Sequence, residues 1–139
     1  MDARAVAERY YTALRRSDLD GVIATLSPDC RAEVPGATLD GREQVRGWMG
    51  SFFDAFPDIS HSTSDLEVQG RTVSATVHVT GTQTAPFVMP QGTLPPTGRT
   101  IDIRARNEME VGDDSIAALR ISFDAGDFMR QLGIGAEPT

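Results

Sequence analysis

The chain has 139 residues, of which 40% are hydrophobic and 24% are charged, and its formal net charge is −7. These values predict a globular domain with its own core and no transmembrane span. The negative charge disfavours nucleic acids and anionic membranes as partners, because both bind concentrated positive charge. The N-terminal stretch MDARAVAERYY lacks the basic and apolar regions of a signal peptide, so we expect a cytoplasmic protein.

The residue types narrow the chemistry further. All 13 basic residues are arginine, and the chain has two histidines and one cysteine, Cys30. Schiff-base lysines, disulfides and Cys/His zinc sites are therefore excluded, and GxSxG and GxGxxG motifs are absent. The side chains that remain available for catalysis are carboxylates, imidazoles, tyrosines and arginines. We therefore expect neither a metal nor a cofactor.

Helical spacing dominates the first part of the chain. Residues 2–17 are predicted to form a helix, and SDLDGVIATLSPD a short second helix that ends before Pro28. A short strand is expected within residues 30–39. A third helix begins near Arg42 and ends at Pro57, with a large apolar stripe that is typical of a core face.

After Pro57 the spacing of the apolar residues changes from the helical period of 3.6 residues to the strand period of two. HSTSDLEV and RTVSATVHVTGT predict one hairpin, and TIDIRARNEMEV and SIAALRISF predict a second. We interpret residues 84–99, between the hairpins, as a lid-like loop, and residues 134–139 as a disordered tail. We therefore predict that residues 1–139 form a single α+β domain, in which a curved, mostly antiparallel sheet wraps around the N-terminal helices and leaves an internal pocket.

Several segments resemble one known family. SPDCRAEVPG, GREQVRGWMGSFFDAFPD, PPTGRTIDIRARN and ISFDAGDFMRQLG occur in the order found in the SnoaL-like polyketide cyclases of the nuclear transport factor 2-like superfamily. The resemblance implies a cone-shaped α+β fold and cofactor-free chemistry on a small apolar molecule. It also implies an acid/base aspartate at the end of the last strand, where this chain has Asp124, and a pocket histidine where this chain has Glu33.

Asp124 is accordingly the first catalytic candidate. An apolar pocket would raise the pKa of a carboxyl group toward neutrality, where it can move protons. The alternative is that Asp124 caps the helical segment that follows it, although Asp127 could serve as that cap instead. Glu33 could share acid and base roles with Asp124 if both face one pocket, or it could be a solvated residue on an edge strand.

Three further residues are candidates for the same site. His78 lies on the polar face of its strand, which could face either solvent or a pocket. Arg120 shares a strand face with Asp124 and could pair with it or stabilise an enolate; the alternative is an exposed arginine. Asn107 lies on an apolar strand face that should point inward, where a buried amide requires partners. The second histidine, His61, is expected at the surface.

Five residues are expected to contact substrate: Tyr10, Trp48, Phe52, Met109 and Phe87. Core packing is the simpler role for Tyr10 and Trp48. The apolar face of the last strand, formed by Leu119, Ile121 and Phe123, would need cover if the opposite face lined the pocket, and this predicts a homodimer through the sheet.

The leading hypothesis is a cofactor-free enzyme that closes a ring or isomerises a small apolar polyketide or natural-product intermediate by acid/base catalysis. The first alternative is an epoxide hydrolase or epoxide-opening cyclase that uses the paired carboxylates. The second is a ligand-binding or assembly module without catalysis.

Overall fold

The N-terminal helices form as the sequence predicts. The computed structural model describes residues 2–89 and 92–133. Helix α1 spans Ala3–Arg15, and its cap residue Asp2 accepts a hydrogen bond from the backbone N–H of Ala5. The short helix α2 spans Leu19–Ala24. Within these described residues, no helix is long and apolar enough to cross a membrane.

One six-stranded sheet organises the molecule, in the order β2-β1-β8-β7-β4-β3. The strands are β1 Leu26–Val34, β2 Ala37–Asp40, β3 Ser60–Gln69, β4 Thr72–Thr82, β7 Thr100–Val111 and β8 Ile116–Ser122. The two predicted hairpins, β3–β4 and β7–β8, are confirmed, and β4 pairs with β7 to join them. The pairing of β1 with β8 is parallel, and the sequence did not predict it.

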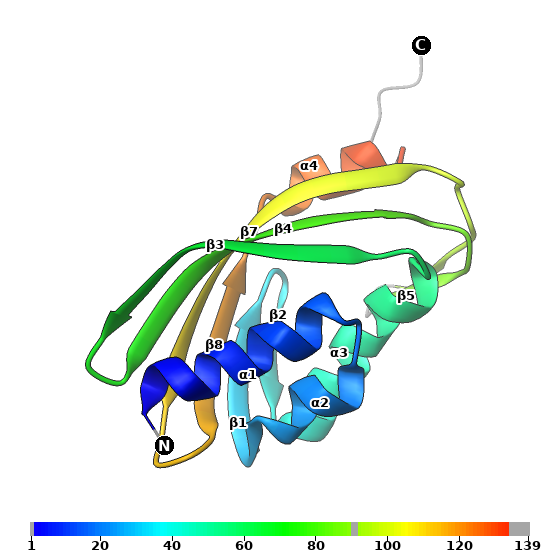
Figure 1. Cartoon of the computed structure of the whole chain (residues 1–139). Helices are drawn as coiled ribbons and strands as arrows, with labels where there is room; N and C mark the ends of the chain where they lie inside the picture. The colour runs from blue at the N-terminus through cyan, green and yellow to red at the C-terminus, as the bar shows by residue number, and fades with distance from the viewer. Residues whose placement is uncertain (1, 90–91, 134–139) are drawn as a thin grey trace.

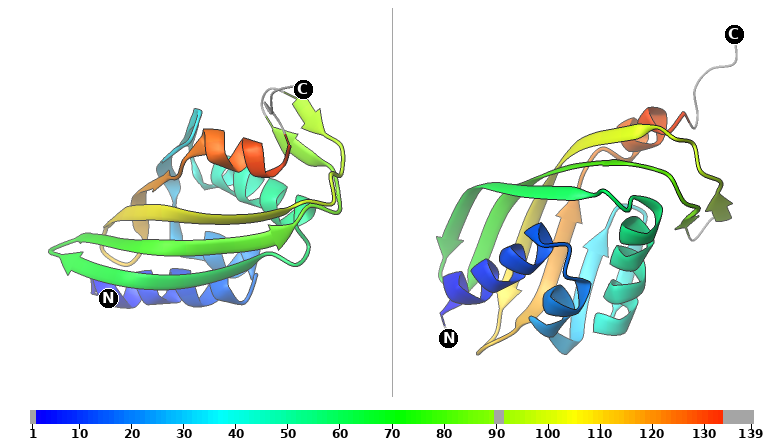
Figure 2. Two further views of the ribbon diagram at one scale, coloured as in Figure 1. Left: turned by 90° about the horizontal axis from the view of Figure 1, so that it is seen from above. Right: turned by 45° about the vertical axis from the view of Figure 1, so that its right-hand side comes forward.

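The sheet curves around α1, α2 and α3, which lie on its concave side (Figures 1 and 2). Helix α3 spans Arg42–Ala55 and ends two residues before Pro57, as predicted. The expected α+β fold with a curved, mostly antiparallel sheet is therefore confirmed.

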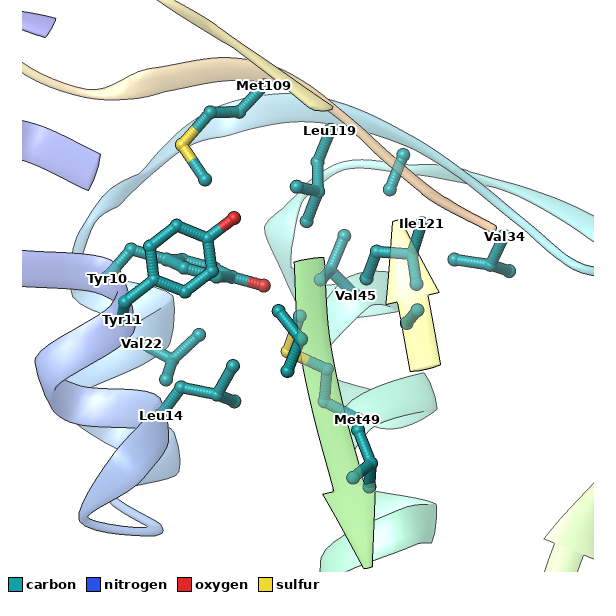
Figure 3. Packing of buried hydrophobic residues seen from close by; sticks show 14 of the residues in the cluster. Tyr10, Tyr11, Leu14, Val22, Val34, Val45, Met49, Met109, Leu119 and Ile121 are labelled. Atoms are coloured by element: carbon teal, nitrogen blue, oxygen red, sulfur yellow. The ribbon is translucent and has the colours of Figure 1, made fainter. Parts of the chain in front are cut away.

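Alternation along the strands separates the two faces of the sheet. Successive residues of β4 and β7 switch between buried and more exposed positions over the full length of each strand. The buried residues point toward the helices, where Tyr10 and Tyr11 of α1 meet Met109 and Leu119 of the sheet (Figure 3). The charged residues thus lie on the convex face.

The segment predicted as a lid contains a small hairpin, formed by β5 Phe87–Met89 and β6 Gly92–Leu94. The fully buried Gln83 anchors it: its side-chain amide donates hydrogen bonds to the carbonyls of Ala85, Leu94 and Pro95. Whether this segment acts as a lid stays a prediction. The C-terminal helix α4 spans Ala125–Gln131, and the predicted tail, 134–139, lies outside the described residues.

Candidate active site

An apolar cavity of about 70 Å³ lies between α1, α3 and the concave face of the sheet. Its deep wall includes the buried residues Tyr10 and Met49, and the half-buried Trp48 and Phe52 lie where the cavity approaches solvent. An engineered cavity of about 150 Å³ holds benzene. Because the present cavity has about half that volume, even a ligand with a single ring requires these half-buried aromatic side chains to move.

His61 provides an ionisable group in this cavity. It lies on β3 opposite Val79 of β4, and its ring packs edge-on against Phe53 with the ring centroids 5.9 Å apart. Burial lowers the pKa of His61 to about 4, and contact with the backbone of Leu14 offsets only part of that effect. The ring is therefore neutral at pH 7. Its Nδ1 atom is buried and has no hydrogen-bond partner in the protein.

Asn107 is the second polar residue of the cavity wall. It is 3% exposed and faces inward from β7, which confirms the predicted orientation. Burial raises the pKa of the neighbouring Tyr11 to about 12, and Asn107 acts in the opposite direction by favouring the phenolate. Even so, neither Tyr11 Oη nor Asn107 Oδ1 makes a hydrogen bond that meets ordinary geometry. Two unpaired polar atoms therefore lie close together at this position.

The five predicted substrate contacts divide into two groups. Tyr10, Trp48 and Phe52 line the cavity, and their contact with a substrate stays a prediction. Met109 and Phe87 are not among the residues that line it. Met109 is fully buried in the core, and Phe87 packs behind the cavity wall against Phe52, with the ring centroids 5.0 Å apart.

Asp124 does not lie inside the cavity, so its predicted apolar setting is wrong. It is exposed and caps α4, because its Oδ1 accepts a hydrogen bond of 2.9 Å from the backbone N–H of Asp127. The preceding residue, Phe123, lines the cavity instead. Since successive strand residues point to opposite faces, an inward Phe123 directs Asp124 away from the cavity.

Glu33 and Arg120 pair with each other on the convex face of the sheet. They occupy paired positions of β1 and β8. Arg120 Nε donates a hydrogen bond of 2.9 Å to Glu33 Oε2, and its Nη2 atom lies 2.8 Å from the same oxygen in an ion pair. Both side chains are more than half exposed. Of the two alternatives for Glu33, the solvated residue is the one observed, although β1 lies between β2 and β8 rather than at the edge of the sheet. Arg120 is exposed and pairs with Glu33, not with Asp124.

His78 also points outward. Its Nε2 atom lies 2.6 Å from Asp102 Oδ1, and the polar face of β4 that carries His78 is the convex face. Of the two alternatives for His78, solvent and pocket, the structure shows that it faces solvent. By the same alternation, the apolar face of β8 points inward, where Ile121 lines the cavity. The reason given for a homodimer, that this face needs a covering partner, is therefore wrong.

The sequence prediction missed His61, which was expected at the surface. Its pairing shows why: Ser64 pairs with Thr76 and Glu67 with Ser74, so two residues of β3 lie opposite one residue of β4. This β-bulge reverses the face on which the earlier part of β3 presents its side chains. A signal was present in Asp65, because aspartate tolerates the left-handed backbone of a bulge better than most residues.

Comparisons with known proteins identify the domain and its fold. The model of the SnoaL-like domain matches residues 7–119. AclR from Streptomyces galilaeus, provisionally assigned as a hydroxylase, is 21% identical with a TM-score of 0.80, and the match covers 99% of this chain and 85% of AclR. A provisionally assigned SnoaL-like polyketide cyclase from Jannaschia sp. CCS1 is also 21% identical, with a TM-score of 0.79 and coverages of 96% and 94%.

A third similar structure is IdmH from Streptomyces antibioticus, provisionally assigned as a polyketide cyclase. It is 24% identical with a TM-score of 0.75, and the match covers 96% of this chain and all of IdmH. Among curated proteins, no sequence matches this chain. At these identities the solved structures establish the fold alone, whereas the domain model covers most of the chain. The chain therefore belongs to the SnoaL-like family.

Proposed function

We propose that the protein is an acid/base enzyme that acts on a small, mostly apolar substrate, with His61 as the base. The observation that carries this proposal is the buried, unpaired Nδ1 atom of a neutral imidazole in an otherwise apolar cavity. The membership of the SnoaL-like family supports ring closure or isomerisation as the reaction, because polyketide cyclases are found among its structural neighbours.

The proposed chemistry is a proton transfer. Nδ1 of His61 takes a proton from a carbon next to a substrate carbonyl, and the electron pair of the broken C–H bond forms an enolate. The enolate carbon then either attacks a second carbonyl of the same molecule, which closes a ring, or receives a proton at another position. The imidazolium of His61 returns its proton to the oxygen or carbon that needs it, so the reaction requires no further reactant.

The environment of His61 suits this role. Burial holds the ring neutral, so the basic form predominates at neutral pH. When an enolate forms beside the ring, its negative charge stabilises the imidazolium in a cavity with a mostly apolar wall. Asn107 lies farther along the cavity and orients the substrate rather than removing the proton.

Exchange of deuterium into 2-indanone, followed by NMR in heavy water, tests the proposal without knowledge of the natural substrate. The protein should accelerate exchange of the protons next to the carbonyl above the buffer rate. His61→Phe should reduce that acceleration at least ~100-fold, the lower end of the typical contribution of a positioned base. The matched control Asp124→Asn should leave it unchanged, because asparagine also caps helices.

Each other outcome assigns a different function. Loss of exchange in Asp124→Asn with full activity in His61→Phe would return the catalytic role to Asp124. No acceleration by the wild-type protein would favour the non-catalytic binding module. The argument for epoxide opening was a pair of carboxylates in one pocket. Glu33 and Asp124 do not share the cavity, so this argument no longer supports that reaction.

A homodimer through the convex face of the sheet remains a proposal. The charged pairs Glu33–Arg120 and His78–Asp102 lie on that face and could contribute to a polar interface. Sedimentation velocity at low and high salt tests it. A dimer that dissociates at high salt would support a polar interface, and a monomer at every protein concentration would contradict the proposal.

A further inference from the structure

We propose that the ligand of the cavity is uncharged and donates a hydroxyl hydrogen to Asn107 Oδ1. This inference rests on the proposed function, because it concerns the same cavity. It goes further in naming the group that the deep end of the cavity recognises and the residue that recognises it.

The first argument is the unpaired amide oxygen. Asn107 is 3% exposed and lines the cavity, yet its Oδ1 atom makes no hydrogen bond of ordinary geometry, even with the neighbouring Tyr11. Leaving a buried acceptor unpaired costs about 1–3 kcal/mol. An oxygen in this position needs a donor, and a ligand hydroxyl supplies one, whereas an ether or a ketone does not.

The second argument is the charge of the wall. Among the residues that the structure describes, the lining includes no arginine, aspartate or glutamate. Burying an unpaired anion such as a carboxylate or a phosphate in this setting would be unfavourable. The wall therefore selects uncharged molecules, and a hydroxyl group is an uncharged donor.

The third argument is the position of Asn107 relative to His61. On β4, their paired residues are Ala75 and Val79, four positions apart. Four strand residues span about 13 Å. The hydroxyl on Asn107 is therefore not the group that reacts at His61. A ligand that reaches both residues has an apolar body between its hydroxyl and its reacting carbon.

Binding of p-cresol and p-xylene provides the test. The two molecules have the same shape, and one carries a hydroxyl where the other carries a methyl group. Trp48 is the only tryptophan of the chain and lines the cavity, so its fluorescence excited at 295 nm reports binding. The quantity to compare between variants is the ratio of the two affinities, because this ratio cancels general effects of a substitution on packing.

We expect Asn107→Leu, which removes the acceptor at similar volume, to lower the ratio of p-cresol to p-xylene affinity about 10-fold. The matched control is Thr63→Val. It removes another buried, unpaired oxygen from the same face of the sheet, but Thr63 does not line the cavity. That variant should keep the wild-type ratio within about twofold.

The inference would be overturned by an unchanged ratio in Asn107→Leu or by no binding of p-cresol to the wild-type protein. Tighter binding of 4-methylbenzaldehyde, which only accepts hydrogen bonds, would also overturn it, since the inward amide atom would then be a donor. These outcomes are independent of the 2-indanone experiment. A protein that prefers p-cresol but exchanges no deuterium would contradict the proposed catalysis and leave this inference intact.

Discussion

The left-handed backbone of Asp65 determines the face on which His61 lies. Asp65 has a φ of 55° and falls within the β-bulge of β3, where it shares one partner position with Leu66. Without this extra residue, His61 would occupy the solvent face of the strand, because the side-chain period is two. The position of the proposed base therefore depends on one unusual backbone conformation.

Substitutions at Asp65 should test this dependence. Asp65→Gly should preserve or slightly raise stability, because glycine adopts a positive φ without strain. Asp65→Val should lower the free energy of unfolding by about 1–2 kcal/mol, since a β-branched residue is disfavoured there. Urea denaturation of both variants measures the difference. Equal stabilities would contradict a role of the bulge in fixing β3.

The low pKa of His61 predicts a dependence of stability on pH. Between pH 6.5 and pH 4 the unfolded chain binds a proton at His61 that the folded protein does not bind. Stability should therefore fall as the pH falls through this range, by about 3 kcal/mol from this residue. His61→Phe should lose that much less stability between pH 7 and pH 4, as measured by urea denaturation. An identical loss in the two proteins would show that burial of His61 has no such effect.

Asp124 should contribute to stability through its cap. Asp124→Ala should lower the free energy of unfolding by about 1 kcal/mol, whereas Asp124→Asn should change it little, because asparagine is an equally good cap. Thermal and urea denaturation would check both values. If Asp124→Asn is as destabilised as Asp124→Ala, the hydrogen bond to the N–H of Asp127 is not what stabilises α4.

The two tyrosines should resist ionisation at alkaline pH. Burial raises the pKa of Tyr11 to about 12 and that of Tyr10 well above its ordinary value. The folded protein should therefore show no tyrosinate absorbance at 295 nm near pH 10. Above pH 10 the unfolded chain releases these protons more readily, so stability should fall as the pH rises. Absorbance that rises near pH 10 in a protein that remains folded would contradict the buried positions.

Much of the fold was predictable because its signals are local. The apolar stripe of α3 and the alternation within β4 and β7 depend on near neighbours in the sequence, and the structure confirms these elements. The parallel pairing of β1 with β8 was not predictable, because Glu33 and Arg120 are 87 positions apart and no turn between them specifies that contact.

The candidate site was less predictable than the fold. Asn107 was placed correctly because a single polar residue interrupts an apolar face. Asp124 was misplaced, and Glu33 and His78 were left open between two settings, because polar residues suggest chemistry whether they face solvent or a cavity. Only the packing of the opposite face decides between these settings. His61 was missed because one inserted residue at the bulge reverses its face.

The most direct test of the account is an NMR titration of the imidazole of His61. The chain has only two histidines, and the spectrum of His61→Phe assigns the resonance of His61 by its loss. We predict that this ring titrates with a pKa of about 4 in the folded protein. It should also shift when p-cresol or 2-indanone enters the cavity. A pKa near the ordinary 6.5, with no response to either molecule, would place His61 in solvent and contradict its role as the buried base.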